Sequence, residues 1–98
     1  MTTYSILLGE QPREYIQALD AKSQQIIKDN LRKLEENPSP GSGPGDKEKL
    51  VVDGEEMYRL HIGRTHTAFY IILDDEAEVR IVEITDIDDA HKRYGFDD

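Results

Sequence analysis

Residues 57–73 read MYRLHIGRTHTAFYIIL, two alternating strand-like runs that are interrupted at Gly63-Arg64. Glycine at the first position of a two-residue turn favours a type II′ β-hairpin. With that turn, His61 lies opposite His66, and the pairing continues outward one residue at a time. The stretch therefore predicts a hairpin at the centre of the fold.

This register gives the hairpin two unlike faces, because side chains of a strand alternate with a period of two. One face is apolar and needs a covering layer; it carries Tyr58, Leu60, Ile62, Phe69, Ile71 and Leu73. The other face mixes polar and apolar groups and carries Met57, Arg59, His61, His66, Ala68 and Tyr70. A permanent cation, two imidazoles and a phenol suit a site that holds a phosphate or transfers a proton.

The composition indicates one small domain without thiol chemistry. The chain has 98 residues, of which 37% are hydrophobic, enough for a single core, so we expect one domain over residues 1–98. It contains no cysteine, which excludes disulfides, thiolate nucleophiles and cysteine-ligated zinc. No signal peptide or membrane-spanning run is indicated. We expect a cytoplasmic protein that needs no cofactor.

The charge is strongly acidic and unevenly distributed. Twelve basic and 21 acidic residues give a net charge of −9. Residues 1–40 contribute −1 (five basic, six acidic) and residues 41–98 contribute −8 (seven basic, fifteen acidic). Proteins that hold a nucleic-acid backbone usually present a basic surface, so the balance is unusual for that class. A solubilised or salt-adapted surface is the simpler interpretation of the acidic residues.

Two amphipathic helices are predicted in the first half of the chain. Residues 3–8 (TYSILL) are rich in strand formers and predict a first strand. Pro12 suits the first position of a helix, and Asp20 suits the N-cap of a second helix that Asn37-Pro38 ends. The apolar positions of the two helices recur at helical spacing and are Pro12, Tyr15, Ile16 and Leu19, then Ile26, Ile27, Leu31 and Leu34.

The second half predicts an antiparallel meander. Three prolines and three glycines in residues 38–45 indicate a flexible loop, taken as residues 38–46. Residues 49–52 (KLVV) and 77–84 (AEVRIVEI) predict strands on either side of the central hairpin, with a tight turn at Asp53-Gly54. The expected fold is α+β, with an N-terminal strand, a helical pair, and a meander whose apolar face the helices cover.

These motifs together resemble the RelE/ParE superfamily of toxin–antitoxin systems. The resemblance spans nearly the whole chain and is strongest at Lys49-Leu50, at residues 57–63 and at Phe69-Tyr70. It implies a small α+β toxin that a cognate antitoxin wraps. Many RelE-like members are ribonucleases that cut messenger RNA in the ribosomal decoding site, whereas ParE-like members bind DNA gyrase.

The resemblance also implies a site. Arg59 and His61 match positions where the ribonucleases often carry basic side chains, and His66 matches a position usually held by arginine. His91 and Tyr94 match the histidine and tyrosine that some members carry in the C-terminal tail. A further family arginine, at the end of the last strand, has no counterpart in residues 84–88, which read ITDID. The candidate RNA contacts are Lys47, Lys49, Arg64, Lys92 and Arg93.

Each candidate also has an ordinary structural interpretation. Arg59 can be a solvated strand residue, and the two strand histidines a cross-strand polar pair. Zinc held by the histidines is a weaker alternative, because their spacing matches no standard metal motif. Three functions stay open at this point: a RelE-like endoribonuclease, a non-enzymatic toxin that binds gyrase, and an inactive relative that only binds antitoxin.

Overall fold

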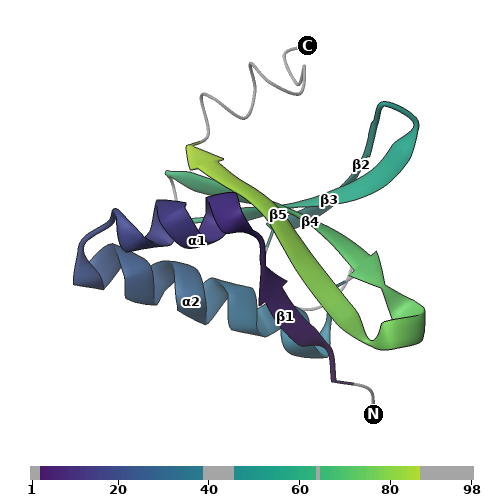
Figure 1. Cartoon of the computed structure of the whole chain (residues 1–98), viewed down its shortest axis with the longest axis horizontal. Coiled ribbons are helices and arrows are strands. Elements are labelled where there is room, and N and C mark those ends of the chain that lie inside the picture. The colour runs from purple at the N-terminus through teal and green to yellow at the C-terminus, as the bar shows by residue number, and fades with distance from the viewer. Residues whose placement is uncertain (1–2, 39–45, 64, 87–98) are drawn as a thin grey trace.

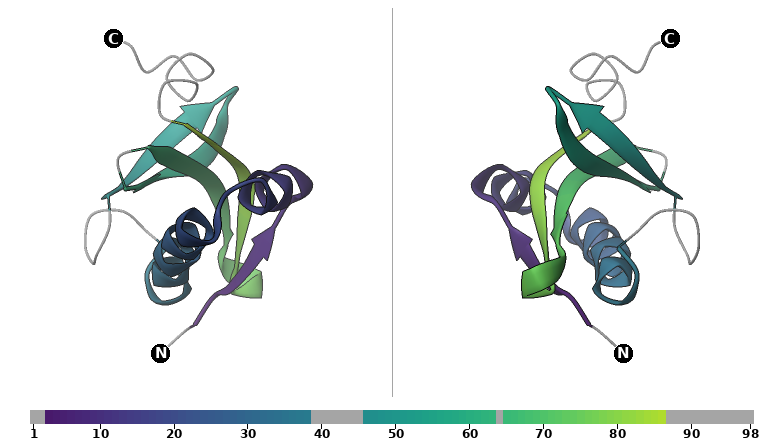
Figure 2. Two further views of the ribbon diagram at one scale, coloured as in Figure 1. Left: turned by 90° about the vertical axis from the view of Figure 1, so that its left-hand side faces the viewer. Right: turned by 90° about the vertical axis from the view of Figure 1, so that its right-hand side faces the viewer.

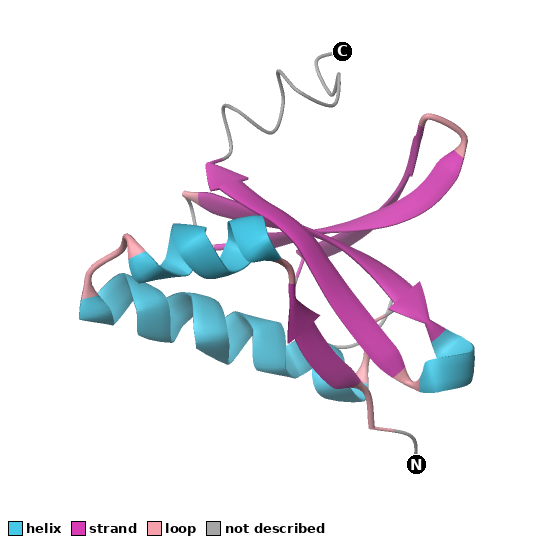
Figure 3. Ribbon diagram, viewed as in Figure 1, coloured by secondary structure: helices cyan, strands magenta, loops and turns pink. Residues whose placement is uncertain are grey.

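A computed structural model describes residues 3–38, 46–63 and 65–86 (Figure 1). Its elements follow the predicted order (Figure 3). They are β1 (Ser5–Leu8), α1 (Glu10–Gln17), α2 (Ala21–Glu36), β2 (Asp46–Val52), β3 (Glu55–Ile62), β4 (His66–Leu73), a 3-10 turn (Asp74–Glu76) and β5 (Glu78–Asp86).

The strands form one twisted five-stranded sheet in the order β1-β5-β4-β3-β2. β1 is parallel to β5, and every other neighbouring pair is antiparallel. Both helices pack against one face of the sheet, while the β2–β3 hairpin projects away from them (Figures 1 and 2). The α+β architecture is therefore confirmed, with the first strand at an edge of the sheet.

The helices begin and end close to the predicted residues. Asp20 caps α2, because its side chain accepts a hydrogen bond from the Ser23 backbone N–H at 3.4 Å, which lowers the pKa of the Asp20 carboxyl. Helix α1 begins two residues before Pro12, which still lies in the first turn, where a missing N–H is tolerated. The prediction that Ile26 faces the core was wrong: its exposed fraction is 41%, because Ile27 takes the inward position.

The core lies between the two helices and the sheet. Its buried members from α1 and α2 are Ile16, Ile27, Leu31 and Leu34, and its buried members from the sheet are Leu60, Ile62, Ala68, Tyr70, Val79, Ile81 and Ile84.

The predicted register of the central hairpin was wrong by one residue. Ile62 pairs with His66 and His61 with Thr67, so three residues, not two, join β3 to β4. Three-residue hairpin loops are the next most common class after two-residue turns, and Gly63 has the positive φ, 62°, that such a tight connection favours. Because side chains alternate with a period of two, the shift exchanges the two faces of β4.

Tyr70 shows what the observed register achieves. Its ring is fully buried under the helices and stacks on Tyr58 with ring centroids 5.5 Å apart. Its hydroxyl donates to the Pro38 carbonyl oxygen at 2.7 Å, and burial raises the pKa of Tyr70. Ala68, Tyr70 and Ile72 therefore face the helices, whereas the predicted core residues Phe69, Ile71 and Leu73 face the other way.

The second hairpin, between β2 and β3, turns at the predicted place. Asp53 and Gly54 both have positive φ values, 52° and 82°, as a type I′ turn requires. Strand β2 begins at Asp46, three residues before the predicted start, and β5 continues to Asp86. The longer β2 brings Glu48 directly opposite Arg59.

Candidate functional site

The candidate site lies on the sheet face opposite the helices, which we call the helix-free face. One row of paired residues crosses four strands of this face and consists of Glu48, Arg59, Phe69 and Glu83. The adjacent row includes His61, Thr67 and Thr85. Four of these seven residues are polar or charged yet buried: Arg59, Thr67, Glu83 and Thr85.

Arg59 is the buried cation of this face. Its exposed fraction is 8%, and its guanidinium forms an ion pair with the Glu48 carboxylate from β2. Burial lowers the pKa of Arg59, but a guanidinium stays protonated throughout the working pH range. The Glu48 side chain is 53% exposed, so this carboxylate is open to solvent while its partner is not.

His61 is two residues from Arg59 on β3 and projects to the same face, where it is half-buried. Across the ladder from His61 is Thr67, whose hydroxyl is buried and has no hydrogen-bond partner among the residues that the structure describes. Arg59, His61 and Glu48 thus form one group of ionisable side chains at the β2–β3 side of the face.

The prediction that His66 shares this face was wrong. His66 lies on the helix side of β4, where its Nδ1 is 2.8 Å from the Tyr15 hydroxyl oxygen of α1. The two rings meet edge to face, with centroids 5.6 Å apart and an interplanar angle of 87°. The one-residue shift in the hairpin is the physical reason, since it moves every β4 side chain to the opposite face.

The lysines of β2 also lie away from Arg59, because they alternate with Glu48 along the strand. The Lys47 ammonium donates to the Asn37 carbonyl oxygen at 2.6 Å, and burial lowers the pKa of Lys47. Lys49 forms an exposed ion pair with Glu56 at 3.0 Å. The remaining predicted site residues lie outside the described residues and are Arg64, His91, Lys92, Arg93 and Tyr94.

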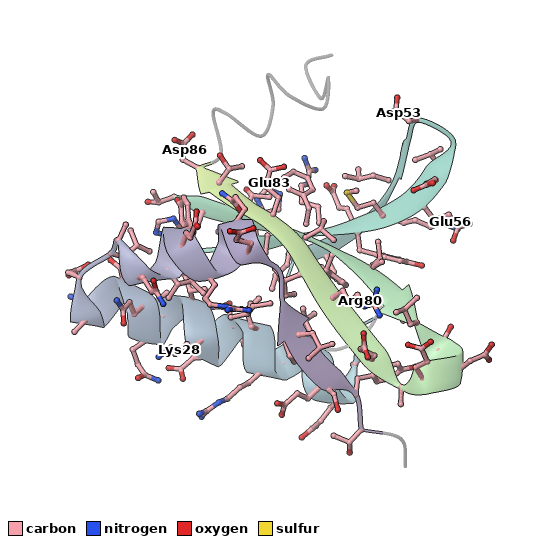
Figure 4. The ribbon with its side chains drawn as sticks, viewed as in Figure 1. Lys28, Asp53, Glu56, Arg80, Glu83 and Asp86 are labelled. Carbon is pink, nitrogen blue, oxygen red and sulfur yellow. The ribbon has the colours of Figure 1, made fainter. Side chains whose placement is uncertain are left out.

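Carboxylates offset the cations of the helix-free face. Arg80 projects from β5 and pairs with Glu78 at 2.5 Å. Glu83 and Arg80 both lie on β5 (Figure 4), and Glu83 completes the row that begins at Glu48. Three carboxylates (Glu48, Glu78 and Glu83) therefore accompany two guanidinium groups (Arg59 and Arg80), and the face does not offer a substrate a positive field.

Glu48 is the functional candidate that the sequence analysis missed. A carboxylate, a guanidinium and an imidazole in one group can together accept a proton, hold a phosphoryl charge and donate a proton. Counting outward from the Asp53-Gly54 turn places Glu48 opposite Arg59, so a signal was present in the sequence. Among the described residues, no three histidine, aspartate or glutamate side chains are grouped to hold a metal ion.

None of the helices in the described ranges is long and apolar enough to cross a membrane.

No curated protein sequence matches the chain. Solved structures match its fold, and three of them are described next.

The RelE–RelB complex of the archaeon Pyrococcus horikoshii has a chain that is 21% identical, with a TM-score of 0.71; the match covers 87% of this chain and 96% of that one. One chain of the RelBE2 toxin–antitoxin complex of Mycobacterium tuberculosis is 15% identical, with a TM-score of 0.72; the match covers 87% of this chain and 99% of that one. The YoeB dimer of Staphylococcus aureus is 25% identical, with a TM-score of 0.67 and coverages of 86% and 97%.

A family model gives the assignment that fold similarity alone does not. The model of the ParE toxin of type II toxin–antitoxin systems matches residues 10–89, from the start of α1 to beyond the end of β5. With the helical pair, the five-stranded sheet and the RelE and YoeB folds as neighbours, this match identifies the chain as a toxin of the ParE family within the RelE/ParE superfamily of type II toxin–antitoxin systems.

Proposed function

We propose that this toxin is a RelE-like endoribonuclease that cleaves messenger RNA on the ribosome in the cytoplasm and is neutralised by a cognate antitoxin. The observation that supports the proposal is the Glu48, Arg59 and His61 group on the helix-free face. Ribosomal messenger RNA as the substrate follows from the resemblance to RelE, and an antitoxin partner from the family and from neighbours that are toxin–antitoxin complexes.

The proposed reaction assigns one role to each side chain. The Glu48 carboxylate accepts the proton of an RNA 2′-hydroxyl, whose oxygen forms a bond to the adjacent phosphorus. The bond from phosphorus to the 5′-oxygen breaks, and the His61 imidazolium donates its proton to that oxygen. Arg59 holds the charge on the phosphoryl oxygens, which a buried guanidinium does at any working pH.

This assignment replaces the pair of histidines that the sequence suggested. His66 now has a structural role against Tyr15, and Glu48 takes the place of the second titrating group. A carboxylate base and an imidazolium acid give a bell-shaped dependence of rate on pH, with Glu48 limiting the acidic side and His61 the alkaline side.

A toxin that binds DNA gyrase is the second candidate, and the acid on the helix-free face favours it. Arg59 lies in one row with two glutamates, Glu48 and Glu83, and a phosphate that approaches the guanidinium meets their negative charge. A protein target tolerates such an acidic surface. The match to the ParE family model agrees with this candidate as well.

Induced growth arrest, with messenger RNA cleavage mapped on purified ribosomes, separates the two candidates. We expect Glu48→Gln and His61→Ala each to lower the cleavage rate roughly 10²–10⁴-fold. Glu56→Gln is the matched control, because it makes the same change in the exposed Lys49 ion pair, and it should cleave as wild type does.

Arrest without cleavage, unchanged in all three variants, would rule out the ribonuclease. Inhibition of DNA supercoiling by purified gyrase would then support the binding toxin. The absence of both growth arrest and cleavage would support the inactive relative.

A further inference from the structure

One buried hydroxyl on the helix-free face has no hydrogen-bond partner among the residues that the structure describes. It belongs to Thr67 of β4, whose exposed fraction is 0%. Buried side-chain hydroxyls are almost always paired, and one that is not lowers the stability of the fold, so this hydroxyl needs an explanation. Because no bulk solvent reaches Thr67, we look for its partner among the side chains that already lie beside it.

The polar neighbours of Thr67 are the two residues directly across the ladder, His61 on β3 and Thr85 on β5. Along β4 the next residue on the face is Phe69, which offers no polar side-chain atom. Cβ atoms of directly opposed residues lie about 4.5–5.5 Å apart, a gap that an imidazole nitrogen bridges to a threonine hydroxyl. The Thr85 side chain is shorter, and no hydrogen bond joins it to the Thr67 hydroxyl. His61 is therefore the neighbour that combines reach with a half-buried ring, open to a substrate on its other side.

The protonation state of the ring decides which way this hydrogen bond runs. An imidazolium carries an N–H on both ring nitrogens and has no acceptor, so the hydroxyl oxygen must accept. Nδ1 is the ring nitrogen nearer the backbone, whereas Nε2 is at the tip of the side chain. Holding Nδ1–H against the sheet turns Nε2–H outward, since the bond made by one ring nitrogen sets the role of the other.

We propose that Thr67 is the positioning residue of His61. Its hydroxyl oxygen accepts the Nδ1–H of the imidazolium, which directs Nε2–H toward the 5′-oxygen that leaves phosphorus. The hydroxyl does not touch the RNA and transfers no proton; it keeps the ring charged to higher pH and holds it in one orientation. The inference rests on the proposed function for the acid role of His61, but the contact itself can be measured without RNA.

Charged residues at neighbouring ladder positions also bear on the titration of His61. They are Arg59 on β3, Asp46 and Glu48 on β2, and Glu83 on β5. Thr67→Val leaves all four in place and keeps the shape of the side chain, so a difference from wild type reports the hydroxyl alone. The variant should fold, because the hydroxyl that it removes has no partner in the described part of the chain.

NMR titration of the histidine ring signals tests the contact in the free toxin. We expect Thr67→Val to move the titration midpoint of His61 about 0.5–1 pH unit lower, because the charged ring loses an acceptor, and Thr67→Ser to keep the wild-type midpoint. Thr65→Val, the same substitution at an exposed loop position, is the matched control. His66 is an internal control, because its ring bonds to Tyr15 on the other face and should titrate alike in every variant.

Cleavage of messenger RNA on purified ribosomes tests the positioning role. The alkaline limb of the rate profile should move to lower pH by the same amount in Thr67→Val, with kcat lowered and KM unchanged, and Thr67→Ser should restore it.

A His61 midpoint that is the same in wild type and Thr67→Val, or that moves equally in Thr65→Val, would overturn the contact. A shifted midpoint with an unchanged rate profile would overturn the positioning role. Absence of cleavage by the wild type would overturn the proposed function, while the titration would still decide the contact.

Discussion

The contact between Tyr15 and His66 permits a test of the corrected hairpin register. His66→Ala removes a hydrogen bond of 2.8 Å and an edge-to-face ring contact, both half-buried. Such a hydrogen bond contributes about 0.5–1.5 kcal/mol and such a ring pair a similar amount, so the free energy of unfolding should fall by about 1–3 kcal/mol. Tyr15→Phe keeps the ring contact and removes only the hydrogen bond, so it should lower the free energy of unfolding by about 0.5–1.5 kcal/mol.

The two variants and their double form a cycle that isolates the pair. Urea unfolding of all four proteins should give a coupling free energy of about 0.5–1.5 kcal/mol between Tyr15 and His66. Growth arrest by His66→Ala should persist at a temperature where the variant remains folded, because His66 is absent from the helix-free face. A variant that unfolds like wild type but no longer arrests growth would refute this placement and return His66 to the site.

Two further contacts carry predictions of their own. Tyr70→Phe leaves the buried Pro38 carbonyl without its donor and should lower the free energy of unfolding by about 1–3 kcal/mol, with Tyr58→Phe, on the stacked neighbour, as control. Burial raises the pKa of Tyr70. The contribution of the Tyr70 hydroxyl to the free energy of unfolding is therefore complete below the ordinary phenol pKa of about 10, and it is lost as pH rises above that value. Urea unfolding from pH 7 to 11 should therefore show the wild type losing more stability than Tyr70→Phe, and parallel losses would contradict the assignment. Gln11→Ala removes two hydrogen bonds of 2.8 Å to the Ile84 backbone. It should lower the free energy of unfolding by about 1–3 kcal/mol and speed hydrogen exchange of the Ile84 amide. The control Gln25→Ala, on the exposed face of α2, should change neither quantity.

Local patterns were sufficient to predict the elements of this fold. The cap at Asp20, the stop at Asn37-Pro38 and the turn at Asp53-Gly54 each act over a few residues, so the chain itself contains the information. The parallel pairing of β1 with β5 could not be read in that way, since it joins Ser5 to Glu78 across most of the chain.

The candidate site was only half predictable, for a reason of register. Gly63-Arg64 is compatible with a loop of two or three residues, and the choice decides whether His66 faces the helices or the other side. Arg59 and His61, on the strand before the loop, were placed correctly relative to the helices. Glu48 was missed because the predicted strand began at Lys49, three residues after the observed start at Asp46.

The pairing of the first strand with the last has a consequence for synthesis on the ribosome. Strand β1 and helix α1 pack chiefly on β5, so the core around Val79 and Ile81 cannot close until residue 86 has left the exit tunnel. A nascent chain therefore reaches the native fold only after β5 has been translated and has left the tunnel. Until then the last strand is missing from the sheet, and the two strands that flank its place, β1 and β4, stay apart.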